Sequence, residues 1–301
     1  MIGYLFGILY ICNLKILNMI ELKELKTYEE LPHISLDDVM DNPFSKYLDL
    51  CFMLILDHIA KRTGREDALF DNMSKDEEYV KKEHDIQDAI RSSLESIDYA
   101  IRFINSYGDN DYLKSDFIPF DKFAAYHYDV ICHKVSTVKD LFFKLTNQTY
   151  NLGLGSKGCK WKPINEKKDI INNSNLFDLF DANEKLNSDV DNKRNASTHD
   201  GSLRISSLCD IKWYLWASNA NEALSKFMPK DPNYERNSRE YSVQINMAKK
   251  KVLNECKIIR YNMFAVTESI FICLFNKLKA NIKQSLPNID NRATEILSQK
   301  G

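Results

Sequence analysis

Arg194, Asn195 and His199 are the residues whose types and spacing point most clearly to chemistry, and they lie in the segment KRNASTHDG at 193–201. Imidazole has the side-chain pKa nearest to neutrality, so His199 can take up and return a proton. A guanidinium keeps its positive charge and presents a planar fork to two phosphate oxygens, a role open to Arg194. Side chains of these types could together carry out proton transfer beside a bound phosphate.

The residues around this group could extend such a site. Lys193 precedes the group and Arg204 follows it, and both could contact the phosphate backbone of RNA. Asp140, on an earlier predicted helix, could face the same segment and pair with Arg194. A simpler interpretation stays open, in which Arg194 and His199 are surface residues paired with carboxylates. The nearby carboxylates are Asp189, Asp191 and Asp200.

The local backbone decides whether Arg194 and His199 can act together. Five residues of regular α-helix turn through about 500°, so the two side chains would point in different directions in the middle of a helix. We expect them to converge at a helix start or a bent turn. Good N-cap residues and a glycine support this, namely Ser197, Thr198, Asp200 and Gly201. A helix N-terminus there would also favour a phosphate.

The composition is that of a globular protein and excludes a disordered chain. Hydrophobic residues make up 44% of the 301 residues and charged residues 28%. This length allows one large domain or two smaller ones. The formal net charge is −2, so no overall basic field indicates a nucleic-acid-binding protein. Any RNA contact must come from a local patch.

The seven cysteines predict neither a disulfide framework nor a zinc site. Their number is odd, and no two of them are separated by only two residues. We expect reduced and mostly buried thiols in a cytoplasmic protein, with no metal ion and no cofactor. His127 and His133 are expected to be core or surface residues and not metal ligands.

The first twelve residues are apolar, and three interpretations of them stay open. They could be a signal or anchor, although no Lys or Arg precedes them and they are shorter than a membrane-spanning helix. Translation could instead begin at Met19, so that residues 1–18 are flexible or not translated. They could also form an N-terminal structural element.

Apolar residues recur at three- and four-residue steps along most of the chain, which predicts helices. The expected helices span 43–64, 74–108, 119–147, 176–186, 205–227 and 241–285. Asn42 and Pro43 mark the start of the first helix, and Gly64 marks its end. Ser74 and Glu77 form a capping box on the second. We expect an all-α bundle of long antiparallel helices, in which any strand pair would be a short hairpin near 152–161.

Two segments outside the central group carry weaker signals for ligand binding. The glycine-rich loop at 153–158 lacks the Gly-Lys-Ser/Thr ending of a P-loop and follows no strand pattern, so we do not expect it to bind a nucleotide. Trp161 lies between Lys160 and Lys162, where it could stack an unpaired base.

Two further groups are better explained by structure. Trp213 and Trp216 are three residues apart on a predicted helix, a spacing typical of core residues. The three lysines at 249–251 are expected to form a solvated helix face, with binding to an RNA backbone as the alternative.

The arrangement of these elements resembles a known family. A long helix at 119–147, a variable connection, the R-N-x3-H step from Arg194 to His199 and another long helix are similar to the HEPN domain of prokaryotic defence and toxin systems. The resemblance places a HEPN-like helical domain at 111–290. It makes residues 1–110 an N-terminal extension of extra helices, and residues 291–301 a tail.

The resemblance implies a metal-independent endoribonuclease. His199 would act as general base on the ribose 2′-hydroxyl or as general acid toward the 5′-oxygen, and Arg194 would stabilise the scissile phosphate. Asn195 would orient His199 or donate a hydrogen bond to phosphate. The product would be a 2′,3′-cyclic phosphate.

The resemblance also implies partners. We expect RNA as the ligand and a homodimer in which two motifs meet, with an antitoxin or a nucleotidyltransferase as a further partner and no association with a membrane. Some toxin members carry a tyrosine two residues after the histidine, where this chain has Gly201, which argues against control by modification there. Two other classes stay open: a catalytically inactive HEPN module that binds RNA or protein, and an unrelated helical scaffold or sensor.

Overall fold

The computed structural model describes residues 33–64, 70, 73–107, 119–200, 205–227 and 234–300. Across these residues the backbone forms helices, turns and connections, and no strand. The expected all-α bundle is therefore confirmed. The interpretations of residues 1–18 lie outside the described residues.

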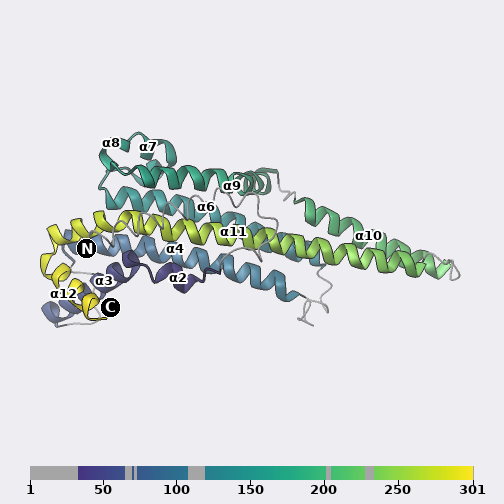
Figure 1. Cartoon of the computed structure of the whole chain (residues 1–301), viewed down its shortest axis with the longest axis horizontal. Helices are drawn as coiled ribbons and strands as arrows, with labels where there is room; N and C mark the ends of the chain where they lie inside the picture. Colours follow the sequence, from purple (N-terminus) through teal and green to yellow (C-terminus); the bar gives the residue numbers. More distant parts are fainter. Residues whose placement is uncertain are drawn as a thin grey trace.

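The helices form a bundle in which the longest helix runs the length of the molecule (Figure 1). In chain order they are α2 (Leu36–Met40), α3 (Pro43–Thr63), α4 (Lys75–Ser106), α6 (Phe120–Thr149), the 3-10 turn η4 (Ser156–Gly158), α7 (Trp161–Asn165), α8 (Lys168–Ile171), α9 (Ser174–Asp200), α10 (Ser206–Phe227), α11 (Tyr234–Ser285) and α12 (Pro287–Lys300).

Figure 1 shows two parts of different thickness along the bundle. At the end where α12 lies, α11 runs beside α4 and α6, with α9 on the outer side of α6. At the other end α10 and the first half of α11 form a two-helix arm that extends beyond the other helices. The arm begins just after the segment that carries Arg194.

The expected start and end signals operate as predicted. The side chain of Asn42 accepts a hydrogen bond from the backbone N–H of Ser45 at 3.0 Å, and Gly64 ends α3 in the left-handed conformation. Ser74 and Glu77 form the capping box at the start of α4. Local sequence therefore determines where α3 and α4 begin.

The largest difference from the expected elements is in α9. The sequence predicts a short helix at 176–186, but the helix continues to Asp200. Its buried face passes from apolar residues to asparagines: Asn183 and Asn187 are buried, and the amide of Asn187 donates to the backbone and side-chain oxygens of Asn183. Because these buried positions are polar, the apolar pattern is interrupted before Val190, and the sequence does not reveal that the helix continues.

Two further differences concern the ends of the last helices. Helix α11 begins at Tyr234, earlier than expected. The residues from 291 onward, expected as a tail, belong to α12, which packs against α3 and α11. The hydroxyl of Tyr47 donates a hydrogen bond to the carboxylate of Asp290 at 2.7 Å and joins α12 to α3. No strand forms at 152–161, where the structure has η4 and the start of α7.

One hydrophobic core extends through α3, α4, α6, α9 and α11. Phe44 of α3 stacks on Phe271 of α11, with ring centroids 4.9 Å apart. The apolar stretch of α11 is long enough to cross a membrane, but most of it is buried inside this bundle, as in the core helix of a soluble protein. Helices on both sides of residue 110 contribute to this core. The division into 1–110 and 111–290 stays a prediction.

Candidate functional site in the groove between α6 and α9

The segment that carries the candidate catalytic residues is the C-terminal part of α9. Arg194, Asn195 and position 199 all lie within the continuous helix Ser174–Asp200, so the expected helix start or bent turn is wrong. The reason is that Asn183 and Asn187 occupy buried positions of α9, which interrupts its apolar pattern while the helix continues. The C-terminal end of a helix carries the negative end of its dipole, which does not favour a phosphate. Any phosphate here must be bound by side chains.

The helical register separates Arg194 from position 199. Five residues of α-helix leave the two positions about 140° apart around the helix axis. Asn195 is placed differently, because position 199 lies four residues after it, one turn further along nearly the same face. A single chain therefore aligns position 199 with Asn195 and not with Arg194.

A groove of about 420 Å³ lies beside this segment. Helix α6 contributes Ser136, Lys139, Asp140 and Phe143, helix α9 contributes Glu184, Asp191, Arg194 and Asn195, and the start of α7 contributes Lys160 and Trp161. The groove thus joins three parts of the chain that are distant in sequence. Four of its residues are candidates from the sequence, namely Arg194, Asn195, Asp140 and Trp161.

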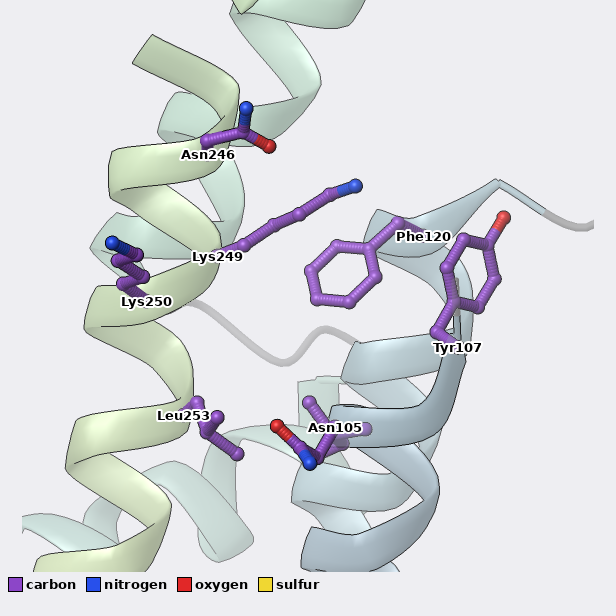
Figure 2. A pocket seen from close by; sticks show the side chains of 8 residues that line it. Asn105, Tyr107, Phe120, Asn246, Lys249, Lys250 and Leu253 are labelled. Atoms are coloured by element: carbon purple, nitrogen blue, oxygen red, sulfur yellow. The ribbon is translucent and has the colours of Figure 1, made fainter. Parts of the chain in front are cut away.

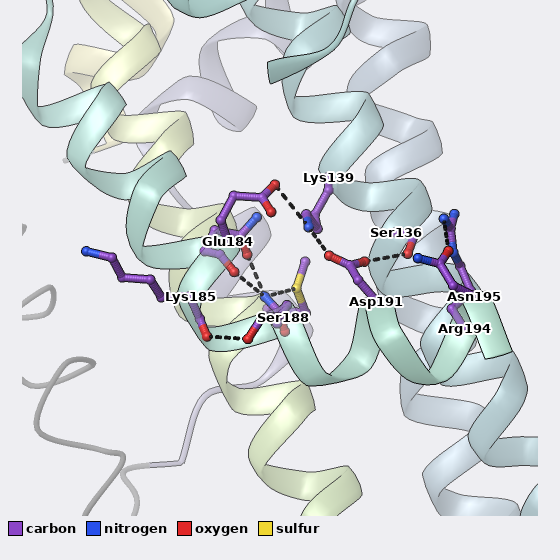
Figure 3. A network of polar contacts seen from close by, with 11 residues as sticks. Ser136, Lys139, Glu184, Lys185, Ser188, Asp191, Arg194 and Asn195 are labelled. Carbon is purple, nitrogen blue, oxygen red and sulfur yellow. Dashed lines mark hydrogen bonds and ion pairs between the residues drawn. The ribbon is translucent and has the colours of Figure 1, made fainter. Parts of the chain in front are cut away.

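An ion-pair network around the buried Lys139 connects the two helices that line the groove (Figure 3). The ammonium of Lys139 lies 3.0 Å from a carboxylate oxygen of Glu184 and also pairs with Asp191. Ser136 donates a hydrogen bond to the other oxygen of Asp191 at 3.0 Å. Lys139 is only 7% exposed. This lysine is therefore neutralised by two carboxylates and joins α6 to α9.

Arg194 differs from Lys139, because its recorded hydrogen bond is to a neutral group. Its Nη2 donates to Oδ1 of Asn195 at 2.8 Å, and Figure 3 shows the two side chains next to Ser136. The Nε atom of Arg194 is buried and has no hydrogen-bond partner among the described residues. Asp140 lines the same groove, but the described residues show no ion pair between it and Arg194, so its supporting role stays a prediction.

The simpler interpretation of Arg194, as a residue paired with a nearby carboxylate, finds no support in the described part of the chain. Asp189 pairs instead with Lys193 at 2.7 Å. Asp191 pairs with Lys139. The side chain of Asp200 lies outside the described residues. Toward the described carboxylates, the guanidinium keeps donors for a ligand.

Of the two predicted RNA-contacting residues, the structure describes Lys193, and it does not bring Lys193 together with Arg194. Lys193 lies on another side of α9, where its ammonium is 3.1 Å from the hydroxyl of Tyr128 and lies over that ring. Arg204 lies outside the described residues, as does the side chain of His199.

A second cavity of about 420 Å³ lies between the end of α4, the start of α6 and α11 (Figure 2). The ammonium of Lys249 lies over the rings of Phe120 and Tyr107, with 4.8 Å and 5.9 Å to their centroids. Burial lowers the pKa of Lys249. The solvated face expected for the lysines at 249–251 therefore holds for Lys250 and Lys251, which are exposed, but not for the half-buried Lys249.

Sequence reasoning missed Lys139, the residue that connects the two walls. A signal for it was present: Lys139 lies four residues after Val135 and three before Phe142, on the buried stripe of α6. A charged residue on a buried stripe needs partners of opposite charge. The sequence does not name those partners, because they lie on another helix.

Comparisons with protein-family models, curated proteins and solved structures gave no match to this chain.

Proposed function

We propose that this chain is a metal-independent endoribonuclease of HEPN type, which binds an RNA phosphate in the groove between α6 and α9. The observation that carries the proposal is the position and hydrogen bonding of the Arg194 guanidinium. Its guanidinium lines the groove, its Nε is buried without a partner, and its recorded hydrogen bond is to the neutral Asn195.

A phosphate would satisfy Arg194 better than the present contacts do. A buried donor without a partner costs free energy, and a charged donor gains most from an anionic acceptor. Lys139 cannot supply a free charge, because Glu184 and Asp191 already neutralise it. Arg194 and Lys160 are then the groove cations available to an RNA backbone.

The proposed reaction needs a base and an acid beside that phosphate. The 2′-oxygen attacks phosphorus while its proton passes to a base, the bond to the 5′-oxygen breaks, and an acid protonates that oxygen. His199 would perform one of these transfers, and Arg194 would stabilise the charge on the phosphate. The product is a 2′,3′-cyclic phosphate and a 5′-hydroxyl end.

The helical register supports a second copy of the chain in this reaction. Within one chain, position 199 lies about 140° around α9 from Arg194. A two-fold dimer with both segments facing one cleft would place His199 of one copy beside Arg194 of the other, and would supply two imidazoles. Such an enzyme would act in the cytoplasm in defence, abortive infection or a toxin–antitoxin pair, with an antitoxin or nucleotidyltransferase as partner.

The test is cleavage of single-stranded RNA by the purified protein in EDTA, with the new ends identified chemically. We expect 2′,3′-cyclic phosphate ends, and no cleavage by His199→Ala. The matched control is His58→Ala, which removes an exposed imidazole on α3, outside the groove. Cleavage that needs added metal, or a His199→Ala variant as active as the parent, would contradict the proposal.

The same assay also tests a second candidate function, that of an RNA-binding module without catalysis. The observation that favours it is the same separation of Arg194 from position 199 within one helix. RNA binding that depends on Arg194, with no cleavage by either the monomer or a dimer of the chain, would identify this function.

A further inference from the structure

Trp161 lies in the same groove as Arg194, although 33 residues separate them in the sequence. Its indole packs against three phenylalanines of α6 and α9. The ring centroids lie 6.2 Å from Phe143, 6.0 Å from Phe177 and 5.8 Å from Phe180. Trp161 remains only partly buried, so part of the indole is open to the groove.

The surrounding chain holds this tryptophan in place. The side chain of Asn147, near the end of α6, bonds the backbone of Leu154 in both directions, at 3.1 Å and 3.0 Å. These bonds fix the loop that leads to α7. Phe177 and Phe180, which belong to α9, are almost fully buried. The indole is thus a rigid surface with little rotamer freedom left to lose on binding.

A rigid aromatic surface beside free cations is a feature of single-stranded nucleic-acid sites. Aromatic side chains stack unpaired bases, and cations contact the phosphates that connect them. Lys160, which directly precedes Trp161, is exposed and lines the groove with Arg194. A base inside a duplex is already stacked on both faces and cannot use such a surface.

We propose that Trp161 is a stacking platform for one unpaired base of RNA whose phosphate is bound by Arg194, so that the groove selects single-stranded over double-stranded RNA. This inference rests on the groove being the RNA site of the proposed function, but it does not require catalysis. It names the class of substrate and the residue that recognises it.

The tryptophan content of the chain gives a direct readout. The three tryptophans are Trp161, Trp213 and Trp216. The latter two stack on each other on the arm, 60% and 61% exposed, against the core position expected for them. A Trp213→Phe/Trp216→Phe variant leaves Trp161 as the sole indole. With His199→Ala added to prevent cleavage, we expect a short oligouridylate to quench its fluorescence, and a duplex of the same length to have little effect.

Binding affinities then test the contribution of the indole. Trp161→Leu is expected to weaken binding of the single strand by about tenfold or more, since stacking on one aromatic residue is typically worth that much, while Trp213→Leu leaves it unchanged. Since Trp161→Leu could disturb the phenylalanine cluster, Lys160→Glu provides a second variant that leaves the cluster intact. Its matched control is Lys162→Glu, an exposed lysine that does not line the groove.

The outcomes separate this inference from the proposed function. Quenching and Trp161-dependent binding without cleavage would support the platform and contradict the nuclease. Cleavage that depends on His199, with binding unaffected by Trp161→Leu and Lys160→Glu, would overturn the platform alone. Equal affinity for duplex, or no binding of oligouridylate by the full chain, would also overturn it.

Discussion

Lys139 of α6 is ion-paired with Asp191 of α9, three residues before Arg194. The same ammonium lies 3.0 Å from Glu184, two turns earlier on α9. One buried lysine therefore holds the helix that carries the candidate site against α6. A buried charge is tolerated only when it is paired, so removing either partner is costly.

Lys139→Met is expected to destabilise the protein by about 1–3 kcal/mol and to reduce RNA binding. Without the ammonium, two carboxylates remain unpaired beside the groove. The expected loss of unfolding free energy is smaller than for a fully buried ion pair, because Glu184 is partly exposed and can be hydrated. Urea unfolding and RNA affinity measure the two effects. Lys144→Met, an exposed lysine on the same helix, is the control and should change stability by less than about 0.5 kcal/mol.

Arg194→Lys is expected to abolish most RNA cleavage although the charge is kept. A guanidinium holds two phosphate oxygens at once, whereas an ammonium is a point charge on a flexible stem. The stability of the variant should stay close to that of the parent, because the recorded hydrogen bond of Arg194 is to the exposed Asn195. Cleavage rate and thermal stability are measured side by side. A variant that cleaves like the parent would make Arg194 a surface residue without a role in the reaction.

The all-α fold, most of its helices and the caps of α3 and α4 could be predicted from the sequence, because these features depend on local spacing. The groove could not. Trp161 and Arg194 are each visible as candidates, but only the packing of α7 and α9 on α6 places them together. The conformation of the segment at Arg194 was predicted wrongly, since buried asparagines such as Asn187 continue a helix without an apolar pattern.

Glu83 provides a prediction about pH. Its carboxyl is fully buried at the junction of α4 and α6, where Thr149 donates a hydrogen bond to it at 3.0 Å. Burial raises the pKa of Glu83 to about 8. A pKa raised in the folded state means that the native protein holds a proton that the unfolded chain releases near pH 4.5. This stabilising contribution is complete at low pH and is lost as the pH rises toward 8.

Glu83→Gln should therefore flatten the dependence of stability on pH between about 5 and 8, and should raise stability near pH 8 by roughly 1–3 kcal/mol. Glutamine keeps the shape and an acceptor for Thr149 but cannot ionise. Urea unfolding of both proteins across this range measures the effect. Glu95→Gln, at a partly buried position of the same helix, is the control. Equal slopes for the parent and Glu83→Gln would show that this carboxyl does not titrate with folding.

A mixing experiment tests whether the catalytic site is shared between two copies. Arg194 and position 199 point about 140° apart on one helix, so we expect Arg194 of one copy to act with His199 of the other. Arg194→Ala and His199→Ala should each be inactive alone. When equal amounts of the two variants are mixed, unfolded and refolded together, half of the dimers should contain one chain of each kind. Each such dimer keeps one intact Arg194–His199 pair across the cleft but only one of the two imidazoles, so part of the parent activity, at most about a quarter, should return.

The alternative arrangements give different results in the same experiment. A site built within one chain regains no activity on mixing, because each chain lacks one of the two residues. Light scattering on the parent protein provides the independent readout, with a dimer expected at micromolar concentration. A monomer that cleaves RNA would exclude the shared site. It would require α9 to bend between Asn195 and Asp200, so that His199 could reach the phosphate held by Arg194 of the same chain.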